Sequence, residues 1–449
     1  MSKNNVLDMT TGNETSLLLK FAIPMLIGNI FQQLYNMADA IIVGHYVGAK
    51  ALGAVGSVGS INFIFFSLCL GLTAGIGILV SQYFGAKNDT FVKKMIGNSI
   101  YLIGGVGLLV SIISVIYAGP ILSLMDTPQD TFADALSYMR ITCGATIIVA
   151  IYNGISSILR ALGDSKTPLI FLTVACFINI VLDFVFILVF DMGVAGTAWA
   201  TIISQAVSAI GSIVYAWKRN PYLKLSKEDM AIDYSLMVKS VRTGMPVAAQ
   251  NAMIAFSCIA LQRVVNGYGS TIMAAYTATG RVEQLIHQPF NSLGMAMSTF
   301  AGQNMGANKL ERVTKGCKKA EKLVFVFSII MLVVMFLFDK AIVSIFIAEP
   351  EIIEIGGNGL KITSVLYFAL GSIYVIRGAL NGVGDVSYAM INGICEVIGR
   401  VFFAFVLGLI PGVGFWSVWL TNGFTWVVTA IAGTIRFVRG RWKTKVLIN

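Results

Sequence analysis

Residues Phe177 to Phe190 read FINIVLDFVFILVF, an apolar run of the kind that spans a membrane, yet Asn179 and Asp183 lie near its middle. Because they are four residues apart, these two side chains share one face of a helix. A carboxylate at mid-bilayer depth costs roughly 2.5–3.5 kcal/mol and usually faces a protein interior or a wet cavity. The run therefore predicts a transmembrane helix with an ion-handling face. The alternative is a structural polar contact between helices.

The rest of the composition is that of a membrane protein. Of the 449 residues, 56% are hydrophobic and 12% are charged, and the mean hydropathy is +0.80. A soluble protein carries about 25% charged residues. Long apolar stretches recur along the chain, and the alternating strands of an outer-membrane barrel are absent. The sequence therefore predicts an all-α polytopic membrane protein.

The net charge of +10 comes from basic residues in the short segments between apolar stretches. This pattern fits the positive-inside rule and argues against a nucleic-acid partner. Most basic residues fall on one side of the predicted membrane, which places both termini in the cytoplasm and the protein in the cell membrane. Twelve spans can be drawn, at residues 17–44, 52–83, 93–118, 132–162, 167–190, 195–217, 238–266, 271–304, 319–347, 352–382, 387–410 and 414–438.

The two halves of the chain repeat one another at a nearly constant offset. Each half holds six spans, an even number, so both halves enter the membrane from the same side. The repeat is therefore parallel, and its pseudo-two-fold axis lies along the membrane normal. We expect an N-lobe at 1–217 (spans one to six), a cytoplasmic linker at 218–237, and a C-lobe at 238–449 with a basic tail. The matching positions are Pro24 with Pro246 at an offset of 222, and Gln82 with Gln303 and Gly163-Asp164 with Gly384-Asp385 at 221.

Asp39 in the first span and Asp183 in the fifth have no basic residue in their own spans. If these carboxylates meet in a low-dielectric cavity, they cannot both stay charged unless a proton or a metal cation binds. Asn179 lies one turn from Asp183, and Asn153 and Thr201 could supply neutral oxygens. An oxygen-rich site suits Na⁺, whereas carboxylates alone suit H⁺. We expect no other metal and no cofactor.

The second half carries a different group of polar residues. Glu283 and His287 lie one turn apart in the eighth span, where they could relay protons or bind a cationic substrate. A hydrogen-bonded polar patch between spans is an equal alternative. Gln284 and Met295 are further candidates for the substrate path, although packing explains most methionines. Glu396 and Arg400 have the spacing of a structural ion pair.

The chain resembles the multidrug and toxic compound extrusion (MATE) transporters over nearly its full length. The residues that carry the resemblance are Pro24 with Asp39, Asn179-x-x-x-Asp183, Gln82-x-x-Gly85-Ala86 with Gln303, and Glu283.

The resemblance implies a cation site at Asp39, Asn179, Asp183 and Thr201, with Asn153 as a polar neighbour. In another branch of the family the eighth-span glutamate works with an aspartate in the tenth span. Here Glu283 matches, but the nearest aspartate, Asp385, lies at the cytoplasmic end of that span.

The resemblance also implies the activity. A secondary antiporter would admit H⁺ or Na⁺ and export amphipathic, often cationic drugs through a central cleft with alternating access. We expect a monomer in the lipid bilayer and no enzymatic activity. The alternatives are a lipid-linked saccharide flippase of the same superfamily and, more remotely, an intramembrane enzyme. The latter would need clustered metal or catalytic residues that the sequence lacks.

Overall fold

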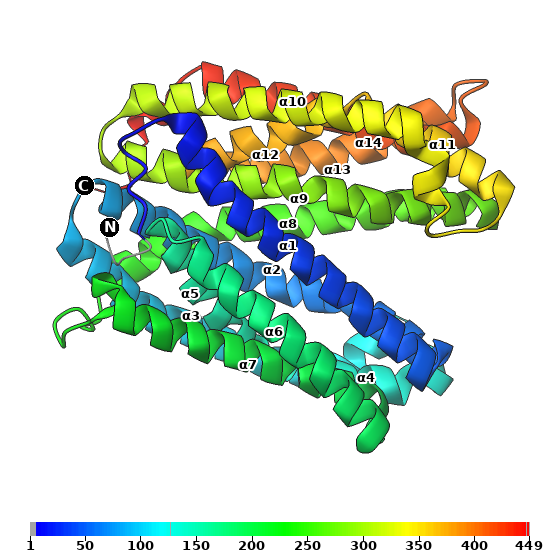
Figure 1. The fold of residues 1–449 in the computed structure, drawn as a ribbon, viewed down its shortest axis with the longest axis horizontal. Helices are drawn as coiled ribbons and strands as arrows, with labels where there is room; N and C mark the ends of the chain where they lie inside the picture. Colours follow the sequence, from blue (N-terminus) through cyan, green and yellow to red (C-terminus); the bar gives the residue numbers. More distant parts are fainter. Residues whose placement is uncertain (1–5, 126, 446, 449) are drawn as a thin grey trace. The chain divides into compact units, whose positions relative to one another are not determined.

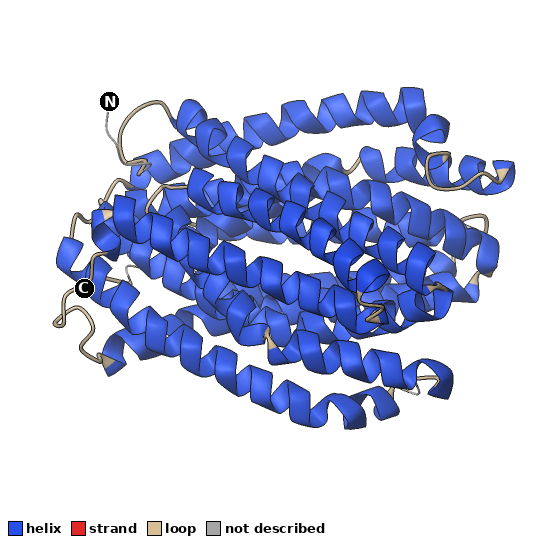
Figure 2. Ribbon diagram, turned by 60° about the horizontal axis from the view of Figure 1, so that its bottom comes forward, coloured by secondary structure: helices blue, strands red, loops and turns tan. Residues whose placement is uncertain are grey.

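The computed structural model describes residues 6–125, 127–445 and 447–448. The remaining residues include both chain ends, so the predicted cytoplasmic location of the termini falls outside the described residues. Helices joined by turns make up the described chain, and it contains no strand (Figure 2). The prediction of an all-α membrane protein is therefore confirmed.

The described residues divide into two compact units. Unit 1 holds the described residues of Met1–Asp8 together with Ile23–Ala248, and unit 2 holds Met9–Ala22 with the described residues of Ala249–Asn449. Each unit is built from long helices that run along one direction (Figure 1).

The first seven α-helices and two short π-helical segments belong to the first repeat. They are α1 (Glu14–Ile42) with η1 (Val43–Val47), α2 (Ala49–Gly85), α3 (Asp89–Leu124), α4 (Gln129–Gly144), α5 (Thr146–Ala161), α6 (Lys166–Phe184) with η2 (Val185–Val189), and α7 (Gly193–Arg219).

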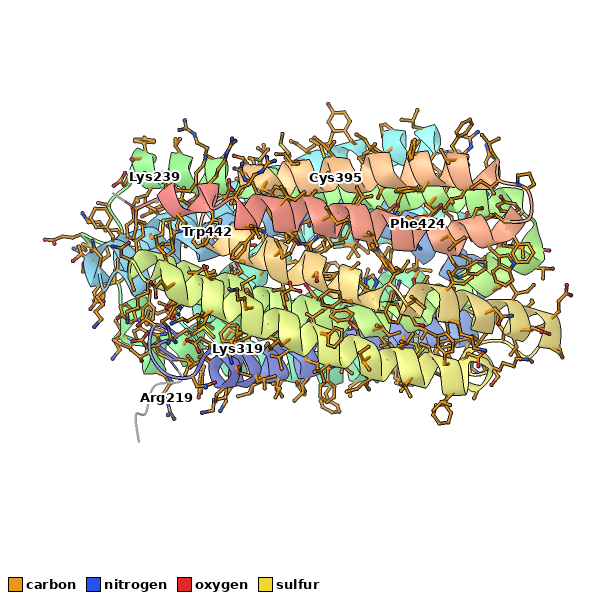
Figure 3. The ribbon with its side chains drawn as sticks, turned by 90° about the horizontal axis from the view of Figure 1, so that it is seen from above. Arg219, Lys239, Lys319, Cys395, Phe424 and Trp442 are labelled. Carbon is orange, nitrogen blue, oxygen red and sulfur yellow. The ribbon has the colours of Figure 1, made fainter. Side chains whose placement is uncertain are left out.

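A linker with a short helix, η3 (Pro221–Leu223), leads to the second repeat. Its helices are α8 (Tyr234–Gly267), α9 (Ser270–Gly306), α10 (Leu310–Val343), α11 (Pro350–Ser364), α12 (Tyr367–Gly382), α13 (Ser387–Gly408), η4 (Gly414–Trp416) and α14 (Ser417–Val438). The last short helix, η5 (Arg441–Thr444), includes Trp442, whose ring stacks on Phe437 and which is labelled in Figure 3.

Length and composition qualify nine helices of the described chain as membrane spans, or up to eleven if two bent pairs each count as one span. The pairs are α4–α5, bent by 42°, and α11–α12, bent by 52°. The expected span that does not qualify is α9, although it is 37 residues long. Arg281, Glu283 and His287 lower its hydropathy. Every one of the twelve predicted spans nevertheless corresponds to a helix or to a bent pair.

The internal repeat is visible in the backbone. Residues with positive φ, a conformation that favours glycine, recur at an offset of 221 in the two repeats. Both bent spans also break at matching points, at Ala145 and Leu366. The matching positive-φ pairs are Gly48 with Gly269, Lys87 with Asn308, Gly163 with Gly384, Asp191 with Gly412, and Gly193 with Gly414.

The two units exchange the beginnings of their leading helices. The first turns of α1, up to Ala22, belong to unit 2, and α8 belongs to unit 1 as far as Ala248. These bounds differ from the lobes expected at 1–217 and 238–449. The sequence divides the chain at its longest polar connection, whereas the packing divides it inside α1 and α8.

Specific contacts hold each exchanged segment. In unit 2 the Met9 amide donates to Gln303 Oε1 at 2.8 Å, and Arg312 pairs with Glu14 at 3.2 Å. In unit 1 the residues just before α8 are held by Asn98 on α3, whose Oδ1 accepts from the Asp233 amide at 2.8 Å and whose Nδ2 donates to the Ala231 carbonyl at 3.1 Å. Within the linker, Asp229 accepts from the Ser226 amide and hydroxyl at 2.8 and 2.7 Å. These hydrogen bonds lower the pKa of the Asp229 carboxyl from its usual value.

Small residues let α8 approach α2 closely within unit 1. A Cβ placed on Gly75 would lie 2.6 Å from the Gly244 amide nitrogen and 2.8 Å from the Ser240 carbonyl oxygen. A Cβ on Gly71 would overlap Ala248. Backbone atoms cannot move aside as a flexible side chain does, so only glycine fits at position 75.

We expect Gly75→Val to destabilise the protein by about 1–3 kcal/mol, because the added side chain forces two helix backbones apart. The measurement is thermal unfolding of detergent-solubilised protein followed by intrinsic fluorescence. Gly104→Ala is the matched control, since a Cβ at Gly104 on α3 meets nothing within 4 Å. Equal unfolding temperatures for Gly75→Val and the wild type would contradict the close contact.

Candidate functional site

The predicted cation-site residues come from helices that pack together within unit 1. Gly28 on α1 lies against Leu169 and Leu172 on α6, where a larger residue would be crowded. Farther along α1, the Phe31 carbonyl accepts a weak hydrogen bond from Cys176 Sγ at 3.9 Å. The helices α6 and α7 run side by side (Figure 1). Three helices thus bring their polar residues to one place.

Asp39 and Asp183 meet at this place. Their carboxyl groups lie close enough for the charge of one to act on the other. Asp183 is completely buried, at 0% exposure, and neither of its oxygens has a hydrogen-bond partner among the described residues. Asp39 is half-buried, and its Oδ1 atom is likewise buried and without a partner.

Neutral oxygens surround the two carboxyl groups. Asn179, buried at 1% exposure, donates from Nδ2 to Thr201 Oγ1 at 3.4 Å, which leaves its own Oδ1 atom without a partner. Tyr35 also lies near Thr201. The structure therefore brings together four of the five predicted residues, namely Asp39, Asn179, Asp183 and Thr201.

No lysine, arginine or histidine of the described chain forms an ion pair with Asp39 or Asp183. A buried carboxylate without a positive partner is costly, and two together are more so. The donor set consists of oxygens alone, which fits H⁺ on a carboxylate or a hard cation such as Na⁺.

Asn153 stands apart from this group. Its Nδ2 atom donates to the Val149 carbonyl of its own helix at 2.8 Å, and no interaction of the described residues joins its side chain to Asp39 or Asp183. Its role in cation binding stays a prediction.

Two tyrosines near the carboxylates were missed by the sequence reasoning. Tyr35 lies on α1 one turn before Asp39, and this i, i+4 spacing could have identified it. Tyr138 on α4 is close enough to Asp39 and Asp183 to interact electrostatically with both carboxyl groups. No local pattern predicts its approach, because Tyr138 is about a hundred residues from Asp39 in the sequence and on a different helix.

The predicted residues of the second half lie in a separate buried cluster of unit 2. Glu283 is 8% exposed and lies near Thr363 on α11, and its Oε1 atom is buried without a hydrogen-bond partner among the described residues. His287 Nδ1 lies 3.4 Å from the Tyr374 hydroxyl, and its Nε2 atom has no partner among the described residues. The rings of Tyr374 and Trp426 each lie 6.1 Å from the imidazole.

The other predicted residues of unit 2 are less closely connected. Gln284 is exposed and Met295 is half-buried. Asp385 is engaged elsewhere, since it accepts from Arg436 Nε at 2.7 Å and from Arg436 Nη2 at 2.9 Å. The cluster around Glu283 therefore has no carboxylate partner of the kind used in the other family branch.

The predicted ion pair of α13 is confirmed. Arg400 Nη1 lies 3.2 Å from Glu396 Oε2, and Arg400 also donates to Ser257 Oγ on α8. All three residues are buried. Glu321, on α10, is half-buried and was missed: it accepts from Ser372 Oγ at 2.6 Å, and its other oxygen is buried without a partner among the described residues. It lies at the start of the predicted ninth span, beside Lys319 and Lys322.

We expect Asp183→Asn to raise the unfolding temperature by about 2 °C or more in sodium-free buffer at pH 8, because removing one charge relieves the repulsion within the carboxylate pair. The measurement is thermal unfolding of the purified protein in detergent. Asn153→Ala, one helix away and outside the pair, should show no such gain. A loss of stability in Asp183→Asn would contradict the description of two unpaired carboxyl groups.

Comparison with known proteins identifies the family. The MatE family model matches residues 24–185 and 246–406, so each matched stretch begins at one of the paired prolines. The probable multidrug resistance protein YoeA of Bacillus subtilis (strain 168) is 31% identical over 435 residues, which cover 95% of this chain and 93% of that protein. The probable multidrug resistance protein NorM of Thermotoga maritima is 25% identical, over 96% of this chain and 94% of that protein.

Solved structures show the same fold. A crystal structure of MATE in the straight conformation superimposes with a TM-score of 0.90 at 23% identity, over 97% of both chains. An outward-facing multidrug resistance MATE family transporter of the MOP superfamily also gives 0.90, at 22% identity, over 98% of both chains. The chain therefore belongs to the MatE family and is a membrane transporter, not an enzyme.

Proposed function

We propose that this transporter exports amphipathic drugs, many of them organic cations, by antiport with H⁺ or Na⁺. The observation that carries the proposal is the pair of buried carboxyl groups, Asp39 and Asp183, that face each other without a basic partner. The names of the relatives, among them a multidrug export protein of Staphylococcus aureus, support drugs as the substrate class.

The chemistry of the pair favours a cycle of cation binding and release. With a proton between them, the carboxyl groups form a hydrogen bond and carry one charge instead of two. Na⁺ would instead draw on the free oxygens of Asp39, Asn179 and Asp183 and on the Thr201 hydroxyl. In either case the empty pair is the less stable state, so the cation gradient can perform work.

Cation binding must act on the conformation of the protein to drive transport. A ligand shifts a conformational equilibrium only by its difference in affinity for the two states. Asp39 lies on α1 and Asp183 lies on α6, so a bound cation pulls these helices together and an empty site lets them separate. We propose that this movement changes the affinity for drug and exposes the binding region alternately to the two sides.

The cluster around Glu283 is the best candidate for drug recognition. It combines a carboxylate with the rings of His287, Tyr374 and Trp426 within unit 2. A negative group beside aromatic rings attracts organic cations through charge and cation–π contacts. Gln284 and Met295 would contribute polar and adaptable apolar contacts at its edge. We place the protein in the bacterial cell membrane as a monomer with cytoplasmic termini.

We expect Asp183→Asn to lose at least about 90% of ethidium efflux, because the antiport cycle needs a carboxylate that can bind and release the cation. The measurement is fluorescence efflux from cells that express the variant at the wild-type level. The matched control is Glu228→Gln in the linker between the repeats, which should transport like the wild type. Full efflux by Asp183→Asn would contradict the proposal.

Proteoliposomes identify the cation. The purified transporter is given a pH gradient or a sodium gradient, each applied alone, and drug movement is followed. Movement under one gradient identifies H⁺ or Na⁺ as the coupling ion. Drug movement that depends on neither gradient would overturn antiport. Transfer of a lipid-linked saccharide in the absence of drug would also overturn it.

A further inference from the structure

The two repeats place different chemistry at equivalent positions. Gly163 with Gly384 and Asp191 with Gly412 share the offset of 221 and bracket the fifth and eleventh spans, so residues between them can be matched without a gap. By this offset Asn179 corresponds to Arg400, Asp183 to Ala404 and Thr201 to Asn422. Asp39 corresponds to Ala260, or to Leu261 if the offset of the paired prolines is used.

The counterpart of the cation site in unit 2 thus has neither carboxylate. Apolar residues replace Asp39 and Asp183, and the guanidinium of Arg400 takes the place of the Asn179 amide. Arg400 is 7% exposed and its charge is balanced by Glu396, at 3.2 Å and 5% exposed. A positive group that belongs to the chain itself therefore occupies this position in unit 2.

Arg400 also joins two helices. It donates to Ser257 Oγ on α8, and two turns earlier along the same two helices Gln250 Nε2 donates to Asn392 Oδ1. The corresponding helices of unit 1 are α1 and α6, the helices that carry Asp39 and Asp183. In unit 1 the polar residues of this helix pair include two unpaired carboxyl groups, whereas in unit 2 the equivalent helices are joined by side-chain hydrogen bonds that need no cation.

We propose that Arg400 is a built-in substitute for the coupling cation, which keeps α8 fixed to α13 while α1 responds to the ion. This inference rests on the proposed function in one respect, namely that α1 is the responsive helix. Arginine stays charged at every physiological pH, so the link in unit 2 cannot be switched by protons and leaves no room for a second cation.

The surroundings of Arg400 agree with a fixed charge. The titratable groups near Arg400 are Glu396 on its own helix, Cys258 on α8, Tyr276, Glu283 and His287 on α9, and Tyr374 on α12. Of these, Glu396 alone is in salt-bridge contact with the guanidinium in the described chain. Removing the guanidinium would leave Glu396 as a buried carboxylate in need of a cation, the condition that the first repeat already meets.

The test is hydrogen–deuterium exchange with mass spectrometry on the full-length protein at pH 8 and pH 5.5, each with and without Na⁺. The quantity compared is the protection factor, that is, the exchange rate corrected for the intrinsic pH dependence of amide exchange. In the wild type we expect protection in residues 31–42 of α1 to change at least about threefold with cation, while protection in residues 253–266 of α8 stays constant. Arg400→Gln should make α8 exchange faster at pH 8 without Na⁺, and protons or Na⁺ should slow it again.

Three further variants separate a charge effect from a general loss of packing. Arg400→Lys keeps the positive charge, so α8 should remain insensitive to cations. Arg400→Gln combined with Glu396→Gln removes both charges, so α8 should exchange faster but without cation dependence. Lys361→Gln, which removes another ion pair of unit 2, at 2.9 Å from Asp339, should leave α8 unchanged.

The outcomes also separate this inference from the proposed function. The role of Arg400 would be overturned if exchange of α8 depended on cation in the wild type. It would also be overturned if exchange of α8 did not depend on cation in Arg400→Gln. Cation-independent exchange of α1 in the wild type, together with normal transport by Asp183→Asn, would overturn the proposed function. The response of α8 in Arg400→Gln could still be observed in that case, so the two failures are distinguishable.

Discussion

The chemistry of this protein depends on two carboxyl groups that share a buried place without a positive partner. Asp183 is fully buried and Asp39 is half-buried, and their carboxyl groups face each other. In most proteins a buried charge is neutralised by a neighbouring side chain. In the antiport that we propose, the neutralising group comes from solution, so the stability of unit 1 depends on an ion that can leave. That dependence is the property a transporter needs.

The repeat shows how one architecture can carry two kinds of chemistry. The backbone features recur at a constant offset, down to matching positive-φ residues and matching bends in the fourth and tenth spans. The polar residues at the cation-site positions do not recur. In unit 1 the polar residues of α1 and α6 are acids and amides. In unit 2 the equivalent helices, α8 and α13, are joined through Arg400 with its partner Glu396 and through Gln250. Duplication preserved the packing and left the side chains free to diverge.

Much of this could be predicted from the sequence. The spacing of Asn179 and Asp183 placed both side chains on one helix face, and the absence of basic residues in the same spans predicted that they would lack an ion partner. The spacing of Glu396 and Arg400 predicted their ion pair. These predictions succeed because helix geometry relates residues three or four apart.

Contacts between distant segments could not be predicted in this way. Tyr138 on the fourth span lies near carboxylates of the first and fifth spans, and no proline marks the break of the fourth span at Ala145. The helix α9 falls short of span-like hydropathy because of its own buried polar residues. The sequence also places the division between lobes in the polar linker, since nothing local records which unit the first turns of α1 and α8 pack against.

The exchanged helix beginnings have a consequence for the origin of the chain. Each unit is complete only when it receives the leading segment of the other repeat, as in a domain-swapped pair. A single-repeat ancestor would therefore have assembled as a parallel homodimer whose copies traded these segments. Fusion of two such genes would convert that obligatory partnership into one polypeptide, and neither half of the modern chain should be able to fold when expressed alone.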